Sequence, residues 1–227
     1  MNKIMNPSEA VKRVKSGDTI MVGGFGLVGA PLTLIEELLN HEAYDLTIIS
    51  NNLGEPGVGL GKLLRQGKIK KAIGSYFTSN RDVGDYYLQG KLQIDVLPQG
   101  TLAECIRAGG AGIGGFYTKT GVGTELAKGK ETREINGELF VLETPLRADV
   151  ALIKAHKADR LGNLVYYKTA RNFNPIMATS ADYCIAEVDE IVETGELHPE
   201  EIVTPHLYVD AIVLSSYMLT KDGVVPR

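Results

Sequence analysis

The sequence has no tryptophan, only two cysteines and only four histidines among its 227 residues. Cys105 and Cys184 lie far apart in the chain, and this spacing indicates neither a disulfide framework nor a metal-binding motif. The histidines also lack metal-ligand spacing, so we expect no metal site. The N-terminal residues include no apolar stretch typical of a secretory signal. A reducing, cytoplasmic setting is therefore expected.

A large excess of one charge is also missing. The chain has 24 lysines and arginines against 28 aspartates and glutamates, for a net charge of −4. Proteins that bind nucleic acid or an anionic membrane surface usually carry a basic face, so we expect neither partner. The longest uncharged run, residues 19–35, contains four glycines and a proline. It is too short and too interrupted for a transmembrane helix.

Short apolar runs alternate with helical stretches of about ten residues, a pattern typical of βαβ units. It predicts an α/β fold with an open, mostly parallel sheet flanked by helices. No linker or internal repeat divides the chain, so we predict a single domain over residues 1–227, with a long insertion at 109–133 near the functional edge. The expected strands are 19–22, 46–50, 69–75, 92–97, 139–142, 150–154, 164–167 and 183–188, and the expected helices are 7–14, one that starts at Pro31, 61–66, 82–89 and 101–107.

Glycine is abundant, and 15 of the 26 glycines fall within residues 23–29, 54–61 and 109–123. The first cluster lies between an expected strand and an expected helix, where glycine allows a tight turn and close approach of a ligand to the backbone. Its G-x-G-x-x-G pattern also occurs in dinucleotide-binding folds, but these require an acidic residue about 20 positions later. Asn51 and Asn52 stand there instead, which disfavours that alternative. Glycines that merely permit close packing of helix and strand are a further alternative.

Two further loops follow expected strand ends. Asn51 and Asn52 begin the second cluster, and Gln99 and Gly100 follow a later strand and lead toward the third cluster. The carboxyl ends of parallel strands meet at one sheet edge, where α/β proteins bind ligands. We therefore predict that the three loops converge on a pocket lined by backbone, suited to a ligand with phosphates and carbonyls. For an isolated pair of asparagines, a role in a turn is the favoured explanation.

Six ordered motifs resemble the alpha (A) subunit of family I 3-oxoacid CoA-transferases, the acetate/butyrate-acetoacetate type. The resemblance covers nearly the whole chain. The sequence departs from the usual family pattern at Ser16-Gly17, Cys105, Gly114-Gly115 and His206, which affects the expected acyl-chain preference and loop stiffness. The motifs are I-M-V-G-G-F-G-L-V-G-A-P at 20–31, S-N-N at 50–52, L-P-Q-G-T-L-A-E at 97–104 with R-A-G-G-A-G at 107–112, T-G-V-G-T at 120–124, A-D-V-A-L-I-K-A at 148–155 and N-F-N-P-I-M-A at 172–178.

The resemblance implies a NagB/RpiA/CoA-transferase-like fold and a ping-pong transfer of CoA. The CoA passes between acetoacetyl-CoA, or another short acyl-CoA, and acetate or butyrate through a glutamyl-CoA thioester. In the family, the nucleophilic glutamate lies in an S-E-N-G motif of the beta subunit, and this sequence contains no such motif. Glu55, Glu104, Glu143 and Glu187 have simpler explanations as turn, helix-face or strand-edge carboxylates.

The resemblance therefore implies that this chain carries no catalytic nucleophile. It would be inactive without a beta subunit, its expected partner in a heterodimer or heterotetramer. CoA is then a substrate, and no permanently bound cofactor is expected.

The resemblance also implies site residues. Gln99 matches an amide that faces the reacting acyl carbonyl, where a hydrogen-bond donor contributes about 3 kcal/mol in comparable sites. Phe25 would exclude water from the mixed anhydride of the reaction, with simple core packing as the alternative. We assign no role to the scattered lysines. The expected CoA-binding loop consists of Gly24, Phe25, Gly26, Leu27, Val28, Gly29 and Ala30, and the expected substrate side consists of Asn51, Asn52, Asn80, Gly100 and Phe116.

One alternative belongs to another functional class. A non-catalytic sensor domain of related fold would bind a phosphorylated small molecule, such as a sugar phosphate, without any partner chain. Its glycine loops would serve the phosphate in the same way. Binding in the absence of a partner distinguishes this alternative from a transferase subunit.

Overall fold

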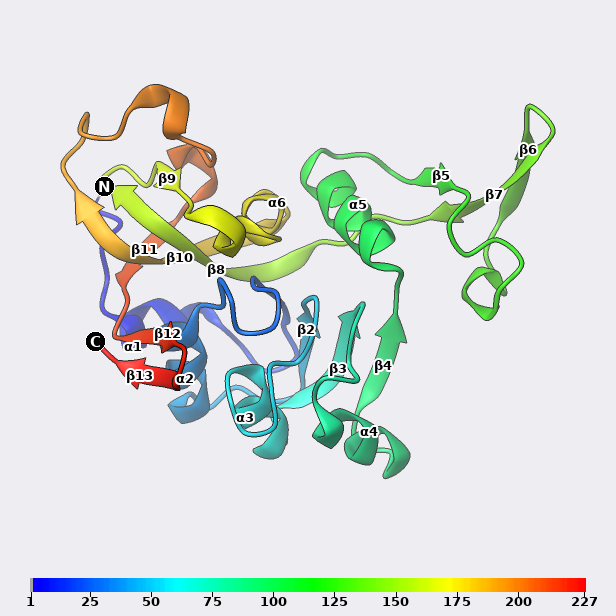
Figure 1. The fold of residues 1–227 in the computed structure, drawn as a ribbon, viewed down its shortest axis with the longest axis horizontal. Coiled ribbons are helices and arrows are strands. Elements are labelled where there is room, and N and C mark those ends of the chain that lie inside the picture. Colours follow the sequence, from blue (N-terminus) through cyan, green and yellow to red (C-terminus); the bar gives the residue numbers. More distant parts are fainter. Residues whose placement is uncertain (1) are drawn as a thin grey trace.

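An eight-stranded, mostly parallel sheet forms the centre of the molecule (Figure 1). The computed structural model describes residues 2–227. Seven strands run parallel in the order β11-β10-β8-β1-β2-β3-β4, and β9 pairs antiparallel with β8. These strands are β1 (Thr19–Val22), β2 (Leu46–Ile49), β3 (Ile69–Gly74), β4 (Gln93–Val96), β8 (Ala148–Asp159), β9 (Leu164–Val165), β10 (Ala181–Val192) and β11 (Ala211–Leu214).

Helices cover both faces of the sheet, so its central strands are apolar on both sides, as parallel sheets require. In β1, Ile20 and Val22 pack against one layer of helices, while Met21 packs against the other. The first layer contains α1 (Pro7–Ala10), the 3-10 turn η1 (Val11–Arg13), α2 (Leu32–Asn40), α3 (Leu60–Arg65) and α4 (Arg81–Leu88), and the second contains α5 (Gln99–Gly110) and α6 (Asn174–Ala178).

The predicted alternation of strands and helices is confirmed in the first half of the chain, with boundaries within a few residues. The first helix is shorter than expected, because α1 ends at Ala10 and continues only as a 3-10 turn. Within residues 2–227, every helix falls short of the length and apolarity that crossing a bilayer would require.

The second half contains longer strands than predicted. β8 and β10 each have 12 residues, whereas the apolar runs indicate only 150–154 and 183–188. Opposite charges continue the ladder beyond those runs: Lys157 lies beside Glu190, and their side chains form an ion pair of 2.7 Å. Such cross-strand pairs stabilise a sheet without apolar alternation. The structure also contains β11, α6 and a C-terminal hairpin of β12 (Tyr217–Thr220) and β13 (Gly223–Pro226), none of which the sequence pattern predicts.

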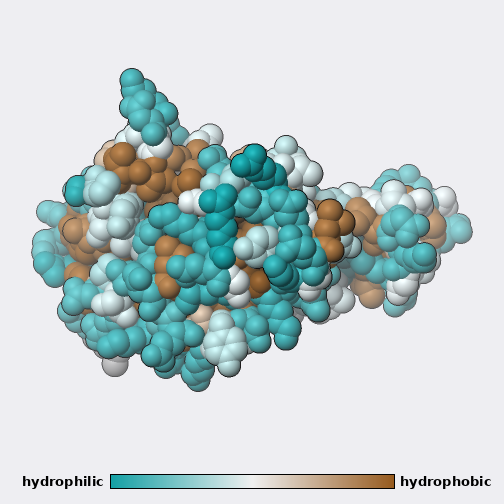
Figure 2. Space-filling model, turned by 90° about the horizontal axis from the view of Figure 1, so that it is seen from below, coloured by the Kyte–Doolittle hydropathy of each residue, from teal (hydrophilic) through white to brown (hydrophobic). Residues whose placement is uncertain are grey.

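The insertion predicted at 109–133 contains strands, since much of this region belongs to a projecting arm. Its three strands form an antiparallel sheet in the order β5-β7-β6, which stands out from the body beyond α5 (Figures 1 and 2). Asn136 and Gly137, with φ of +52° and +79°, join β6 to β7. An Asn-Gly pair is a strong hairpin signal that could have predicted this turn. The strands are β5 (Phe116–Thr118), β6 (Thr132–Ile135) and β7 (Glu138–Glu143).

Five short 3-10 turns occur in the described chain. Besides η1, one lies in the arm between β5 and β6, one joins β9 to α6, and two lie between β10 and β11. These turns are η2 (Glu125–Ala127), η3 (Lys168–Arg171), η4 (Pro199–Glu201) and η5 (His206–Tyr208).

The single-domain organisation over residues 1–227 stays a prediction.

A buried carboxylate joins the sheet to α2. Glu187 is 0% exposed on β10, an interior strand, so the expected strand-edge explanation is wrong. It accepts hydrogen bonds from the Thr33 and Leu34 amides at 2.9 and 3.2 Å, at the first turn of α2. The Ser215 hydroxyl donates to it at 2.8 Å, and Lys154 Nζ lies 3.7 Å away. Burial raises the pKa of Glu187, and Lys154 and these donors oppose the rise.

We expect Glu187→Gln to lower the free energy of unfolding by about 2 kcal/mol or more, because its amide NH₂ faces donors that need an acceptor. Glu190→Gln on the same strand is the control; its half-exposed ion pair with Lys157 should contribute less than about 1 kcal/mol. Urea denaturation of both variants measures the difference. Equal losses would contradict the bridging role of Glu187.

Candidate substrate-binding site

The loop after β1, residues 23–30, forms a tight hairpin turn at the carboxyl edge of the sheet. The Phe25 amide donates to the Val28 carbonyl at 3.0 Å, and the Val28 amide donates back to Phe25 at 3.2 Å. Gly26, inside the turn, has a φ of +62°, which lies in the left-handed region that favours glycine. The chain then enters α2, so the turn lies between a buried strand and a helix N-terminus.

The loop after β2 repeats this geometry. The Glu55 and Val58 amides and carbonyls pair at 3.2 and 3.0 Å, and Gly57 in this second turn has a φ of +73°. Because β1 and β2 are parallel neighbours, the two turns lie at the same sheet edge. The predicted convergence of the first two glycine clusters is therefore confirmed. One narrow cavity between them is lined by Val22, Gly23, Gly24, Gly26, Leu27, Ala30, Ile35, Ser50, Asn52, Gly54, Gly59 and Leu60.

The third cluster does not join them, and this part of the prediction is wrong. Only Gln99 and Gly100 follow a sheet strand, and glycines 109–123 come at the end of α5 and in the segment that leads to the arm. Gly109 has a packing role, because a Cβ there would collide with the Leu146 carbonyl oxygen and the Ser180 hydroxyl. Gln99 and Gly100 are exposed at the start of α5, after β4, two strands away from β2.

Asparagine side chains hold the backbone of the first glycine loop. Asn52 Oδ1 accepts from the Gly26 amide at 2.9 Å. Asn172 accepts from the Gly24 amide at 3.1 Å through Oδ1 and donates to the Val28 carbonyl at 3.0 Å through Nδ2. Since unpaired buried backbone groups are costly, these bonds favour one loop conformation before any ligand binds.

A third asparagine, Asn174, fixes the end of the same loop. It is fully buried, and its Nδ2 donates to the carbonyls of Gly29 at 3.0 Å and Ala170 at 2.9 Å. Its Oδ1 accepts from the Lys154 amide in β8 at 2.8 Å. In the sequence, Asn172 and Asn174 stand out only as parts of a family motif. No local sequence pattern indicates their role, because their partners in the glycine loop lie more than 140 positions earlier in the chain.

The predicted substrate-side asparagines lie near the loops, but their amides have partners within the chain. Asn51, Asn52 and Asn80 are all buried. Asn51 Oδ1 accepts from the Ser75 hydroxyl at 2.7 Å. Asn80 donates to the Leu53 carbonyl at 2.7 Å and caps α4 by accepting from the Asp82 amide at 3.1 Å. The structure thus gives them a supporting role in the turns, and direct contact with substrate stays a prediction.

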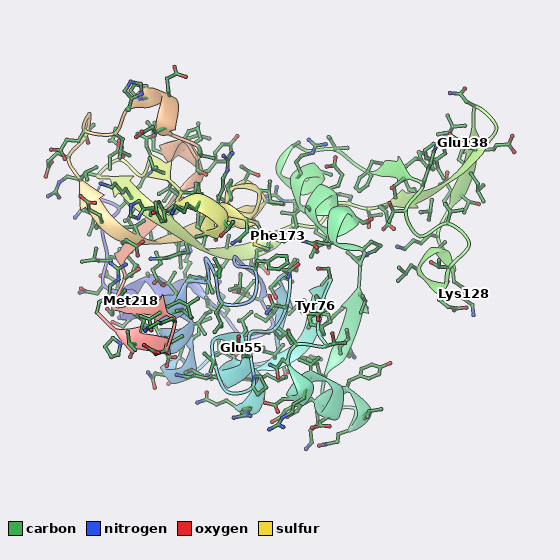
Figure 3. All side chains as sticks on the ribbon, in the orientation of Figure 1. Glu55, Tyr76, Lys128, Glu138, Phe173 and Met218 are labelled. Carbon is green, nitrogen blue, oxygen red and sulfur yellow. The ribbon has the colours of Figure 1, made fainter. Side chains whose placement is uncertain are left out.

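The two aromatic residues predicted for the site are placed differently. Phe25 is 50% exposed on the first turn, so the core-packing alternative is wrong for it. Phe116 lies in β5 of the arm, on a separate part of the molecule from the glycine loops (Figure 1). Figure 3 shows Glu55, Tyr76 and Phe173 around the edge where the loops lie. Tyr76 is 57% exposed, whereas Phe173 is buried, so Phe25 and Tyr76 supply the exposed aromatic surface at this edge.

The remaining glutamates considered as nucleophiles have local partners or lie open to solvent. Glu55 is exposed on the second turn. A hydrogen bond from Arg107 lowers the pKa of Glu104, and Glu143 is buried beside Lys130 at 2.7 Å. No cluster of His, Cys, Asp and Glu side chains within residues 2–227 could hold a metal ion.

Two backbone donors of the first loop differ from the others in having no partner within residues 2–227. The amides of Leu27 and Gly29 have no hydrogen-bond acceptor among the described residues, whereas the other amides of residues 23–30 donate to carbonyls or to asparagine oxygens. Amides at a glycine turn before a helix suit a phosphate or a developing oxyanion. The amides of Leu27 and Gly29 are therefore candidate donors to an anion or a carbonyl oxygen.

Known proteins define the class to which this arrangement belongs. The sequence matches the family described as Coenzyme A transferase over residues 4–215. The A subunit of the probable succinyl-CoA:3-ketoacid coenzyme A transferase of Bacillus subtilis (strain 168) is 51% identical over 217 residues, 95% of this chain and 91% of that protein. The A subunit of the 3-oxoadipate CoA-transferase of Pseudomonas putida is 53% identical over 211 residues, 92% of this chain and 91% of that protein.

A solved structure agrees on the fold. The acyl-CoA transferase YdiF from E. coli O157:H7, in a thioester complex with CoA, has a TM-score of 0.83 at 22% identity over 94% of this chain. This chain spans 47% of that protein's length. The chain belongs to the Coenzyme A transferase family. Since its relatives are named as A subunits, it corresponds to the alpha (A) subunit, as the sequence motifs implied, and the dinucleotide-binding alternative is set aside.

We expect Gly29→Ala to destabilise the chain more than Gly26→Ala does. Both glycines have a φ in the left-handed region, so alanine costs about 1–2 kcal/mol of backbone strain at either position. At Gly29 the new Cβ would also collide with the Ala170 carbonyl, whereas nothing lies within 4 Å at Gly26. The extra loss should be about 1–3 kcal/mol in urea denaturation. Equal losses would contradict the close packing of this loop.

Proposed function

We propose that this chain is the alpha subunit of a heteromeric CoA-transferase that moves CoA between acetoacetyl-CoA, or another short acyl-CoA, and acetate or butyrate. The observation that carries the proposal is the glycine loop with its free Leu27 and Gly29 amides, held in place by three asparagines. A related protein, the alpha subunit of the acetate CoA-transferase of Escherichia coli (strain K12), is 47% identical over 213 residues, 94% of this chain and 97% of that protein.

The proposed reaction begins on the partner chain. A glutamate carboxylate of the beta subunit attacks the thioester carbonyl, and the CoA thiolate leaves as a mixed anhydride forms. The thiolate then attacks the glutamyl carbonyl, which releases the first acid and leaves a glutamyl-CoA thioester. The acceptor carboxylate attacks that thioester, and the thiolate returns to the new anhydride at its acyl carbonyl. This last step forms the new acyl-CoA and restores the glutamate.

In this proposal the alpha subunit binds and orients rather than attacks. The Leu27 and Gly29 amides receive an oxygen of the acyl-CoA, and the Gln99 amide donates to the acyl carbonyl as negative charge develops. The exposed ring of Phe25 would exclude water from the anhydride, which hydrolysis would otherwise destroy. We place Asn51, Asn52, Asn80, Gly100 and Phe116 on the substrate side, with CoA as a substrate and not a resident cofactor.

The proposed setting is cytoplasmic. Cys105 and Cys184 are both unbridged and buried. Burial raises the pKa of Cys105 to about 11, so its thiol stays protonated and unreactive at neutral pH. A reducing compartment is compatible with both thiols, and the beta subunit would share it.

We expect the purified chain to have no transferase activity alone and to gain it on mixing with the beta subunit and acetoacetyl-CoA. A borohydride-reducible glutamyl-CoA adduct should then form on the beta subunit, as mass spectrometry of both chains would show. An adduct on this chain, or on neither chain, overturns the proposal. Calorimetric binding of a sugar phosphate to the chain without a partner would instead support the sensor alternative.

We expect Gln99→Ala to lower the kcat of the alpha–beta complex about 100-fold, the usual effect of removing one oxyanion donor. Complex formation, followed by gel filtration, should not change because Gln99 is an exposed side chain at a helix start. Gln89→Ala, an exposed glutamine at the end of α4, serves as the matched control. Unchanged turnover in Gln99→Ala would remove this residue from the site.

A further inference from the structure

The segment after β9, residues 167–171, lies directly against the first glycine loop. Its Ala170 carbonyl accepts from Asn174, the same amide group that donates to Gly29. A Cβ on Gly29 would collide with this carbonyl, so the two backbones are in contact. Asn172, which follows the segment, bonds to both Gly24 and Val28. The position of residues 167–171 is therefore tied to that of the glycine loop.

This segment carries two exposed cations that lack a counter-ion. Neither Lys168 nor Arg171 has a carboxylate within ion-pair distance anywhere in residues 2–227. On β8 and just beyond it, by contrast, Lys157 and Arg160 are paired with glutamates at 2.7 Å. Because nearby cations such as Lys157 and Arg160 are already paired, Lys168 and Arg171 stand out as cations without a carboxylate partner in the described part of the chain. Two such cations next to the glycine loop are available to an external anion.

The backbone of this segment is also strained. Lys168 has a φ of +48°, a conformation that costs a non-glycine residue about 1–2 kcal/mol. Its Nζ lies 5.0 Å from the centre of the Tyr167 ring, which is itself 55% exposed. Strain of this kind persists where the surroundings impose it, often at ligand-binding sites. Here Asn172 donates to the Thr169 carbonyl at 3.1 Å and Asn174 donates to the Ala170 carbonyl at 2.9 Å, so the backbone that follows Lys168 is held against the loop.

We propose that Lys168 and Arg171 bind the phosphate groups of the acyl-CoA substrate. This inference rests on the proposed function and adds the phosphate subsite to it. CoA carries a diphosphate and a 3′-phosphate at the end remote from the thioester. The planar guanidinium of Arg171 suits bidentate phosphate binding, and Lys168 supplies a compact second charge. The adjoining glycine loop then receives the part of the substrate nearer the thioester.

A carboxylate surface of the beta subunit is the competing partner for these cations. The direct hydrogen-bonded link between residues 167–172 and the glycine loop favours the substrate, because the same loop is proposed to receive the acyl-CoA. The two possibilities differ in what the cations stabilise, namely the bound acyl-CoA or the assembled complex. One set of variants can separate them.

The test uses the alpha–beta complex with Lys168→Ala, Arg171→Gln and the double variant. We expect the double variant to raise the KM for acetoacetyl-CoA about tenfold or more, since hydrogen bonds to charged groups are the stronger kind. The kcat and the KM for acetate should not change. The wild-type complex should prefer acetoacetyl-CoA over its 3′-dephospho analogue, and the double variant should lose most of this preference. Arg171→Lys should restore binding only in part.

Lys12→Ala, an exposed lysine in η1 without an ion pair, is the control and should leave every constant unchanged. An unchanged KM for acetoacetyl-CoA in the double variant overturns the inference, as does an equal rise in KM for the dephospho analogue. Loss of the alpha–beta complex on gel filtration, with a normal KM for the residual complex, also overturns it and assigns the cations to the contact with the beta subunit.

Failure of the proposed function is recognised separately, because the wild-type complex would then transfer no CoA at all. Calorimetric titration of the wild-type and double-variant complexes with CoA still decides the phosphate subsite in that case. A dissociation constant about tenfold weaker in the double variant supports it. Equal dissociation constants overturn it.

Discussion

The hydrogen bonds that asparagine side chains make to the first glycine loop are the constraint on which the site depends. A loop of eight residues between a buried strand and a helix has backbone donors and acceptors that its own short turn cannot pair. Asn52, Asn172 and Asn174 pair them from two separate parts of the chain. The close approach explains the glycines as well, because a Cβ on Gly23 would collide with the Asn174 side chain.

The same network continues into the sheet and reaches the C-terminus. The Lys154 amide in β8 holds Asn174, and the Lys154 ammonium pairs with Asp189 in β10 at 2.6 Å. Arg227 also pairs with Asp189. Burial acts to raise the pKa of Asp189, but the Lys154 and His156 hydrogen bonds and the Arg227 charge bring it below its ordinary value. Hydrogen bonds and ion pairs thus connect polar groups from the loop to the last residue, and Glu187 joins them to α2.

The extent to which the sequence predicts this structure varies with the kind of signal. Apolar runs such as Thr19–Val22 mark the central strands correctly, since burial on both faces leaves a continuous apolar pattern. The outer halves of β8 and β10 give no such signal, because cross-strand charge pairs replace apolar residues there. The glycine-rich composition of residues 109–123 predicts a loop. The Asn136-Gly137 pair, in contrast, marks the hairpin between β6 and β7 of the arm. Gln99 and Phe116 rest on motifs alone, and the fold separates Phe116 from the loops.

The sequence by itself determined the α/β alternation, the glycine positions that permit the turns, and the membership of the family. These three properties follow from local composition and from the order of the motifs, and both can be read from the sequence alone. The tertiary structure decided which amides are already paired, which backbone donors stay free, and which cations stand beside the loop. Such facts depend on contacts between residues as far apart as Gly24 and Asn172, which are 148 positions apart. Only the completed sheet brings those segments together, because no local pattern records a distant partner.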